Sequence, residues 1–213
     1  MHAFQFQTTK SILSEVGSTA KIGGIMAEMG CKKVGFVTDK IILELGLAKA
    51  ALDSLKEANI DVHIIDDVVA DPPEAIILKA VDECKGAGVD GVVSVGGGSS
   101  MDTAKLIAVL SGSDQPIEEM YGVGLVKDGR LPMVLAPTTA GTGSEVTPIS
   151  IVTTGTNEKK GVVSHQLLPD WAILDAELTV GLPAHITAAT GIDAMVHAID
   201  CLLYTSPSPR DRG

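Results

Sequence analysis

The 213-residue sequence has few aromatic side chains, since Phe, Trp and Tyr together make up only 3% of it. Hydrophobic residues nevertheless reach 45% and charged residues 20%, a balance that excludes a globally disordered chain. A chain of this length fits one large domain, or one domain and the start of another. Its core must be built from Val, Ile, Leu, Ala and Met.

Cysteine is also scarce, and Cys31, Cys84 and Cys201 are far apart and odd in number. Such a set is not a disulfide framework, so we expect a protein of the reducing cytoplasm. Residues 1–10 lack the charged segment followed by an apolar segment that is typical of a signal peptide. No run of about 18 apolar residues occurs, so no contact with a membrane is predicted.

Positive charge is the third shortage, because 16 Lys and Arg residues stand against 27 Asp and Glu residues, for a formal net charge of -11. No basic cluster is present to follow a phosphate backbone, which excludes nucleic acid as a partner. The acidic balance does not exclude a bound dinucleotide, because backbone amides at a helix N-terminus can neutralise a phosphate locally.

Strand-like and helix-like segments alternate along most of the chain. Apolar segments typical of short buried strands occupy residues 33–38, 61–65, 91–95 and 131–136, and helical spacing occupies residues 41–58, 72–85 and 101–110. Strands separated by helices predict βαβ units, and therefore an α/β fold with a Rossmann-like parallel sheet.

The pattern changes after Pro137. Residues 149–153, 161–164 and 171–174 are short strand-like segments joined by turns, and we expect them to form a β excursion outside the βαβ pattern. A helical pattern returns at Pro183, which suits a first helical turn. Residues 201–213 interrupt that helix with a Ser-Pro-Ser-Pro-Arg run, which we interpret as a non-native tail; a genuine disordered tail is the alternative.

A glycine-rich stretch at residues 96–105 directly follows an apolar strand and opens a helix. Glycine allows a positive φ and a close approach of the backbone to a ligand, and the free amides of a first helical turn point at an anion. Ser99 and Ser100 can cap the helix and donate to phosphate. The stretch departs from the G-x-G-x-x-G fingerprint, and an ordinary glycine-rich turn is the alternative.

A second loop, residues 137–147, also follows a strand and contains five hydroxyl side chains and two glycines. These groups suit hydrogen bonds to phosphate, ribose or a nicotinamide amide. The alternative is a solvated Thr/Gly loop.

Asp39 ends the first clear strand. A carboxylate at the carboxyl edge of a parallel strand can accept from ribose hydroxyls and repels a 2′-phosphate. The alternative is that Asp39 only caps the helix that follows it.

Asp193 and His197 are four residues apart, so they share one face of a helix and can bind one metal ion. A carboxylate and an imidazole suit Fe²⁺, Zn²⁺ or Mn²⁺. The alternative is an ordinary surface pair, and Asp200 is interpreted as a solvated carboxylate.

Taken together, these motifs resemble the iron-containing (group III) alcohol dehydrogenase family over residues 4–200. The resemblance implies an α/β dinucleotide-binding domain at residues 1–182 and, at residues 183–200, the first helix of an all-helical metal-binding domain that the chain truncates. It implies NAD and Fe²⁺ as cofactors, with Zn²⁺ as the alternative metal. The implied metal ligands are Asp193 and His197, and the implied cofactor-binding residues are Asp39, Gly96, Gly97, Gly98, Ser99, Asp102, Thr138, Thr139, Thr142, Ser144, and Lys159 or Lys160.

Two departures from the family pattern follow from the resemblance. Asp71 stands where the family often has Asn in a Pro-Asn-Pro-like turn, which alters a contact on the adenosine side. The family's two further metal ligands are histidines of the helical domain, and His2, His63, His165 and His185 do not match their positions.

The implied function is hydride transfer between a primary or secondary alcohol and NAD, with a divalent metal polarising the alcohol oxygen. The partners are a small alcohol or aldehyde and, at full length, a second copy in a homodimer. Other members of the dehydroquinate synthase-like superfamily, such as glycerol dehydrogenase or maleylacetate reductase, are an alternative. A nucleotide-binding module without catalysis is the second alternative, and it is what we expect of the 213-residue chain itself.

Overall fold

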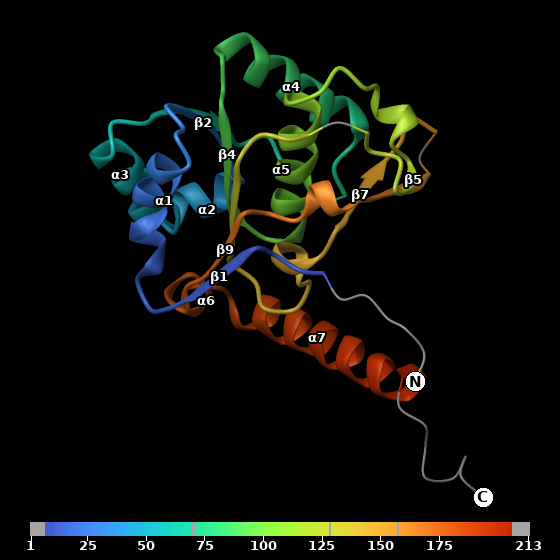
Figure 1. The fold of residues 1–213 in the computed structure, drawn as a ribbon. Helices are drawn as coiled ribbons and strands as arrows, with labels where there is room; N and C mark the ends of the chain where they lie inside the picture. Colours follow the sequence, from blue (N-terminus) through green and yellow to red (C-terminus); the bar gives the residue numbers. More distant parts are fainter. Residues whose placement is uncertain (1–6, 70, 128, 157, 206–213) are drawn as a thin grey trace, which may run out of the picture.

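A six-stranded parallel sheet forms the centre of the computed structural model, which describes residues 7–69, 71–127, 129–156 and 158–205 (Figure 1). The strand order is β1-β9-β6-β4-β2-β3. The strands are β1 (Ser11–Ser14), β2 (Lys33–Val37), β3 (Asp61–Ile65), β4 (Gly91–Gly96), β6 (Met133–Pro137) and β9 (Trp171–Leu174). The predicted α/β fold with a parallel sheet is confirmed.

Helices cover both faces of this sheet (Figure 1). α4 (Glu74–Ala87) and α5 (Gly98–Ser111) pack on one face, and α1 (Ile22–Glu28) and α3 (Lys49–Glu57) pack on the other. In β4, Val92 joins the core cluster that contains Ile107 of α5, while Val93 joins the cluster that contains Leu55 of α3. Burial on both faces explains why the central strands are continuous apolar runs without alternation.

The segment at residues 41–58, predicted as one helix, is two. α2 (Lys40–Glu44) is followed by Gly46, whose φ of 72° is left-handed, and α3 starts at Lys49. Leu47 N donates to Ile42 O, the turn pattern that closes a helix at a left-handed glycine. The apolar spacing continues across this break, which hid it in the sequence.

A small second sheet packs against α5, with the order β5-β8-β7. It contains β5 (Gly122–Val123), β7 (Ile149–Thr153) and β8 (Lys159–Val163), of which β7 and β8 are antiparallel. The β excursion is therefore confirmed for these two segments. It is wrong for residues 171–174, because β9 lies in the main sheet between β1 and β6. β1 itself was not predicted.

Two helices follow the main sheet: the short α6 (Glu177–Val180) and the long α7 (Ala184–Thr205) (Figure 1). The predicted start near Pro183 is confirmed, but the helix is not interrupted at Cys201, since it continues to Thr205. Residues 206–213, most of the segment interpreted as a non-native tail, lie outside the described residues. Single-turn 3-10 helices are η1 (Ser18–Lys21), η2 (Ile117–Glu119), η3 (Ser144–Val146) and η4 (His165–Leu167).

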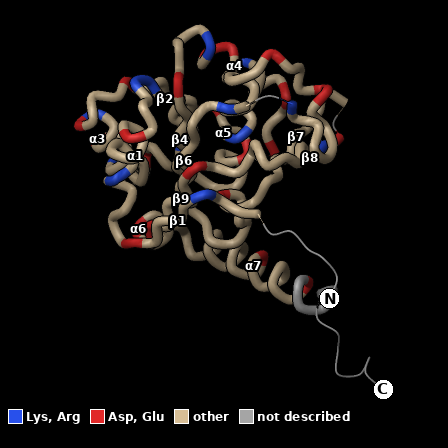
Figure 2. The backbone as a smooth tube through the Cα atoms, viewed as in Figure 1, with Lys and Arg blue, Asp and Glu red and all other residues tan. Residues whose placement is uncertain are grey.

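Charged side chains of both signs are dispersed over the elements, and Figure 2 shows Lys and Arg interspersed with Asp and Glu. Within the described residues, no helix combines the length and hydropathy needed to cross a membrane.

Candidate functional site

A groove lies where the strand connections diverge. The chain leaves β2 for α2 and α3 on one face of the sheet, and leaves neighbouring β4 for α5 on the other face. Such a switch point opens a crevice beyond the carboxyl ends of the strands. A cavity of about 610 Å³ occupies this place. Its lining comes from four strand ends and the start of α7: Asp39, Lys40, Ile41, Ile42, Asp66, Asp67, Val68, Val69, Gly97, Gly98, Ser99, Ser100, Thr138, Thr139, Leu182 and Ile186.

The glycine-rich stretch forms the floor of the groove. β4 ends at Gly96, Gly97 is the N-cap of α5, and Gly98 is its first helical residue. The first amides of an α-helix have no partner inside the helix, and no side chain caps this one. The α5 N-terminus thus presents free N–H groups and the positive end of its dipole to the cavity.

Two local expectations for this stretch are wrong. Gly96, Gly97 and Gly98 all lack a positive φ, so backbone strain is not what requires glycine. Close packing is, because a Cβ on Gly96 would lie 2.6 Å from Ser100 Cβ and a Cβ on Gly98 3.1 Å from Thr142 Cγ2. The serines do not cap α5 either, because they lie within its first turn.

Thr138 and Thr139 bring the second loop to the groove, directly after β6. Thr138 N donates to Gly96 O at 2.9 Å, which holds the two loops side by side. Thr139 Oγ1 is buried and makes no hydrogen bond within the described part of the chain. A buried hydroxyl without a partner costs free energy, so a ligand atom at this position would satisfy it.

Thr142 and Ser144 lie behind the groove instead of in its lining. Thr142 packs against Gly98. Ser144 Oγ donates to Asp102 Oδ1 at 2.5 Å, and Asp102 Oδ2 accepts from Ile151 N at 3.2 Å. Asp102 thereby ties α5 both to the second loop and to the small sheet.

Lys105 completes this network from inside the protein. Its side chain is fully buried, and Nζ donates to Ile149 O at 2.8 Å and to Asp102 Oδ1 at 3.3 Å. Burial lowers the pKa of Lys105, while the charge of Asp102 opposes that change. The pair therefore anchors α5 to the small sheet behind the groove floor.

Asp39 satisfies both of its sequence interpretations. Its Oδ1 accepts from Ile42 N at 3.0 Å, so it is the N-cap of α2, and it also lines the groove. No hydrogen bond to Oδ2 occurs within the described residues, so this oxygen can accept from a ligand hydroxyl.

Lys159 and Lys160 lie on opposite faces of β8, outside the groove lining. Lys159 Nζ forms an ion pair with Asp71 Oδ1 at 2.8 Å, and Lys160 Nζ lies 5.4 Å from the ring centroid of Tyr121. Asp71 has a φ of 52° and precedes α4. Lys159 is thus directed to the turn where the resemblance places the adenosine side.

Asp193 and His197 share one exposed face of α7. His197 Nε2 lies 3.6 Å from Asp193 Oδ1, and 68% and 48% of the two side chains are exposed, respectively. Within the described residues, no group of three or more His, Cys, Asp or Glu side chains is placed to hold a metal ion. The donor set fits a divalent metal, but the described part of the chain supplies only two ligands.

A family model named iron-containing alcohol dehydrogenase matches residues 9–176. The chain belongs to this family. It is 37% identical over 208 residues to a sulfoacetaldehyde reductase of Bilophila wadsworthia, an alignment that covers 97% of this chain and 54% of the relative. The chain thus spans about half the length of this curated relative.

Solved structures agree with the family assignment. A 1,3-propanediol oxidoreductase superimposes with a TM-score of 0.93 and 31% identity, covering 98% of this chain and 55% of that one. A sulfoacetaldehyde reductase from Bifidobacterium kashiwanohense, solved in complex with NAD⁺, superimposes with a TM-score of 0.85 and 31% identity, covering 93% and 53%.

In this member of the iron-containing alcohol dehydrogenase family, the apolar and acidic residues that line the walls of the groove were not predicted from the sequence, with the exception of Asp39. Ile41, Val69, Leu182 and Ile186 line the groove, and no sequence motif marked them. Asp66 and Asp67 follow β3 as Asp39 follows β2, and this repeated position was the signal that could have identified them.

Proposed function

We propose that this chain binds NAD in the groove and forms the dinucleotide-binding part of an oxidoreductase that interconverts small alcohols and aldehydes. The observation that carries the proposal is the uncapped N-terminus of α5, which opens into the groove at the switch point of the sheet. The family assignment supports the same reaction class.

In this proposal the pyrophosphate lies on the floor of the groove. The first-turn amides at Gly98 and Ser99 donate to it, and the absence of a side chain at Gly97 lets the backbone approach. Thr139 Oγ1 supplies a further donor, which would end its isolation. Gly96 supports the turn from beneath through its packing on Ser100.

The adenosine end fits the part of the groove built by β2 and β3. Asp39 Oδ2 accepts from a ribose hydroxyl while Oδ1 keeps its capping bond. Ile41, Val69 and Ile186 provide apolar surface for the adenine ring. Lys159 is the better placed of the two lysines for a ribose contact, because its partner Asp71 belongs to the turn before α4.

Asp102, Thr142 and Ser144 act from behind the floor in this proposal. They fix the loop after β6 against the first turn of α5, so the donors at Ser99 and Thr139 keep their spacing. Donors held in place before binding lose less entropy when the ligand arrives.

Asp193 and His197 are two ligands of a divalent metal, Fe²⁺ or alternatively Zn²⁺, in the proposed oxidoreductase. When bound, this metal supplies Lewis-acid polarisation of the substrate oxygen, and the nicotinamide accepts or donates the hydride. The chain positions the two ligands through α7. A Cβ on Gly141 would lie only 2.4 Å from Thr190 O, so the helix packs tightly on the loop after β6, one turn before Asp193.

We further propose that the 213-residue chain binds NAD without turning over alcohol, because two ligands leave most metal positions to water. The buried free thiols of Cys31 and Cys84 favour a reducing cytoplasm. The exposed apolar residues Ile192, Met195 and Ile199 of α7 are surface that the rest of the proposed helical domain would cover, and for the full-length protein we propose a homodimer.

Calorimetric titration of the chain with NAD tests the proposal. We expect saturable binding with one NAD per chain, and weaker binding in Thr139→Val, which removes the unpartnered hydroxyl at nearly constant volume. Thr187→Val is the matched control, because Thr187 of α7 is exposed and does not line the groove, and it should bind like the parent. A parent chain that does not bind NAD would refute the proposed function.

A further inference from the structure

A second acidic residue faces the place proposed for the adenosine ribose. Asp39 and Asp67 are opposed in an isolated antiparallel bridge, and both line the groove. Residues opposed in such a bridge lie about 5 Å apart at their Cα atoms. Any group placed beside the Asp39 carboxylate is therefore also close to Asp67.

The groove wall also contains a positive charge. Of the described residues that line the groove, only Lys40 is basic, and it directly follows Asp39. An ammonium group in this position is what a 2′-phosphate on the ribose would need as a counter-ion. Asp67 engages it, since Lys40 Nζ lies 3.5 Å from Asp67 Oδ1.

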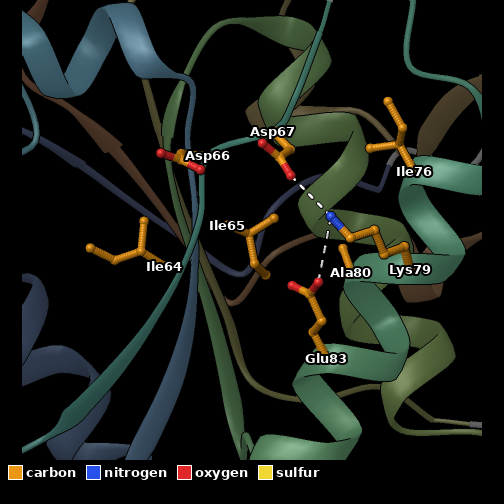
Figure 3. Close-up of a pocket in the computed structure, with 8 residues that line it drawn as sticks. All are labelled: Ile64, Ile65, Asp66, Asp67, Ile76, Lys79, Ala80 and Glu83. Atoms are coloured by element: carbon orange, nitrogen blue, oxygen red, sulfur yellow. Dashed lines mark hydrogen bonds and ion pairs between the residues drawn. The ribbon is translucent and has the colours of Figure 1, made fainter.

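Asp67 is bound from its other side as well. Figure 3 shows its side chain pointing at Lys79 of α4, across a smaller cavity of about 310 Å³, with Glu83 on the far side of the same lysine. Lys79 Nζ lies 3.1 Å from Asp67 Oδ2 and 3.6 Å from Glu83 Oε1. Asp66 points the opposite way, and Asp66 and Asp67 are the wall shared by the two cavities.

We propose that Asp67 is a specificity-determining residue that works beside Asp39, cancelling the charge of Lys40 and thereby disfavouring a cofactor with a 2′-phosphate. The inference rests on the proposed binding of NAD in the groove. Its physical basis is charge: a ribose phosphate carries about two negative charges near neutral pH. The Asp67 carboxylate repels these negative charges, and it also pairs with Lys40, the cation that would otherwise bind the phosphate.

The ionisation state of Asp67 supports this role. The hydrogen bond from Lys79, together with the charges of Lys79 and Lys40, lowers the pKa of Asp67, so the carboxylate is charged at neutral pH. The pairs are exposed, with 66% of the Lys40 side chain and 54% of the Asp67 side chain accessible. Exposed ion pairs stabilise a fold little, so Asp67 can be changed without unfolding the protein.

The test is Asp67→Asn, which keeps the shape of the side chain and removes its charge. Calorimetric titrations with NAD and NADP give the ratio of the two affinities for each variant of the chain. We expect Asp67→Asn to shift that ratio toward NADP by about fivefold to tenfold, the size of one unit-charge interaction across about 4 Å of water, because the Asp67 side chain is exposed. The shift should shrink as salt concentration rises.

Glu83→Gln is the matched control, because it removes another carboxylate paired with Lys79 but does not line the groove. It should leave the ratio unchanged. Adding Lys40→Met to Asp67→Asn should reverse most of the gain for NADP.

A ratio of NADP to NAD affinity that is the same in Asp67→Asn as in the parent would overturn the inference while leaving the proposed function intact. An equal shift in Glu83→Gln would overturn it too, since any loss of negative charge would then suffice. Failure of the parent chain to bind NAD would instead refute the proposed function, and the inference with it.

Discussion

Ser144 Oγ donates to Asp102 Oδ1 at 2.5 Å and so joins the loop after β6 to the first turns of α5. The two residues are 42 positions apart in the sequence, and neither lines the groove. Their hydrogen bond fixes the spacing between the first-turn amides of α5 and Thr139 Oγ1, the donors that do line the groove.

Ser144→Ala should weaken NAD binding and lower the free energy of unfolding by about 1 kcal/mol, the usual size of a lost hydrogen bond. Ser150→Ala is the matched control, because Ser150 Oγ donates to the Asp102 backbone carbonyl at 3.0 Å without involving the loop. It should lose similar stability and keep its NAD affinity. Calorimetry and chemical denaturation measure both quantities, and equal NAD affinities in the two variants would contradict a role for the loop spacing.

Asp39→Asn should shift the ratio of NADP to NAD affinity toward NADP, because it removes the charge that repels a 2′-phosphate. Asn caps a helix about as well as Asp, so the unfolding free energy should stay near that of the parent. Asp39→Ala should give the same shift in specificity and lose about 1 kcal/mol through the missing cap. An Asn variant with an unmoved ratio would reduce Asp39 to a helix cap.

Gly98→Val should abolish most NAD binding. The new Cβ would lie 3.1 Å from Thr142 Cγ2, so the larger side chain must displace the first turn of α5. The amides of this turn are the proposed donors to the phosphate. Gly86→Val in α4 is the control, since nothing lies within 4 Å of its Cβ position. Titration of the folded variants with NAD decides the matter, and full binding by the Gly98 variant would exclude the α5 N-terminus as the phosphate site.

Cys84 should make the protein less stable above pH 9. Burial, with a smaller contribution from the charge of Glu83, raises the pKa of this thiol from 9.0 to about 11. The unfolded chain then loses the proton at lower pH than the folded chain. The contribution of Cys84 to the free energy of unfolding is fully present below pH 9. This contribution falls by roughly 2 kcal/mol as the pH rises from 9 to about 11.

Denaturation of Cys84→Ala across this pH range checks the prediction, because the decline should be shallower than in the parent. Val81→Ala removes buried apolar surface from the same helix without removing a titratable group, so its decline should run parallel to that of the parent. Equal slopes for the two variants would show that Cys84 is not the cause.

Zn²⁺ should bind weakly to the chain, and His197→Ala should remove this binding. Two ligands on one helix face leave the other coordination positions to water, so no preorganised site raises the affinity. His185→Ala on the same helix is the control and should bind Zn²⁺ like the parent. Tight, stoichiometric retention of metal by the purified chain would contradict the prediction.

The local sequence pattern was sufficient for the central strands and for placing one loop after β4 and another after β6. Residues 33–38, 61–65 and 91–95 were predicted to within one residue of β2, β3 and β4, because short apolar runs with flanking polar residues suit strands buried on both faces. The glycine-rich stretch was assigned to a strand-to-helix turn because it directly follows an apolar run and precedes a segment of helical spacing.

Features that depend on distant partners were not predicted. β1 is short and pairs with β9, about 160 positions later, so nothing in residues 11–14 marks a strand. β9 looked like part of the β excursion because its neighbours in sequence are β7 and β8, while its neighbours in space are β1 and β6. The break at Gly46 was hidden by apolar residues that keep helical spacing on both sides of it.

The sequence by itself therefore determined the class of fold, the family and the chemistry of the loops, because these follow from residue type and local spacing. Only the tertiary structure decided which loop residues reach the groove. It placed Thr139 in the lining and Ser144 behind it, and it set Asp67 opposite Asp39 and within reach of Lys40. The direction of a side chain at the end of a strand depends on the elements packed around it, and those contacts come from residues far away in the chain.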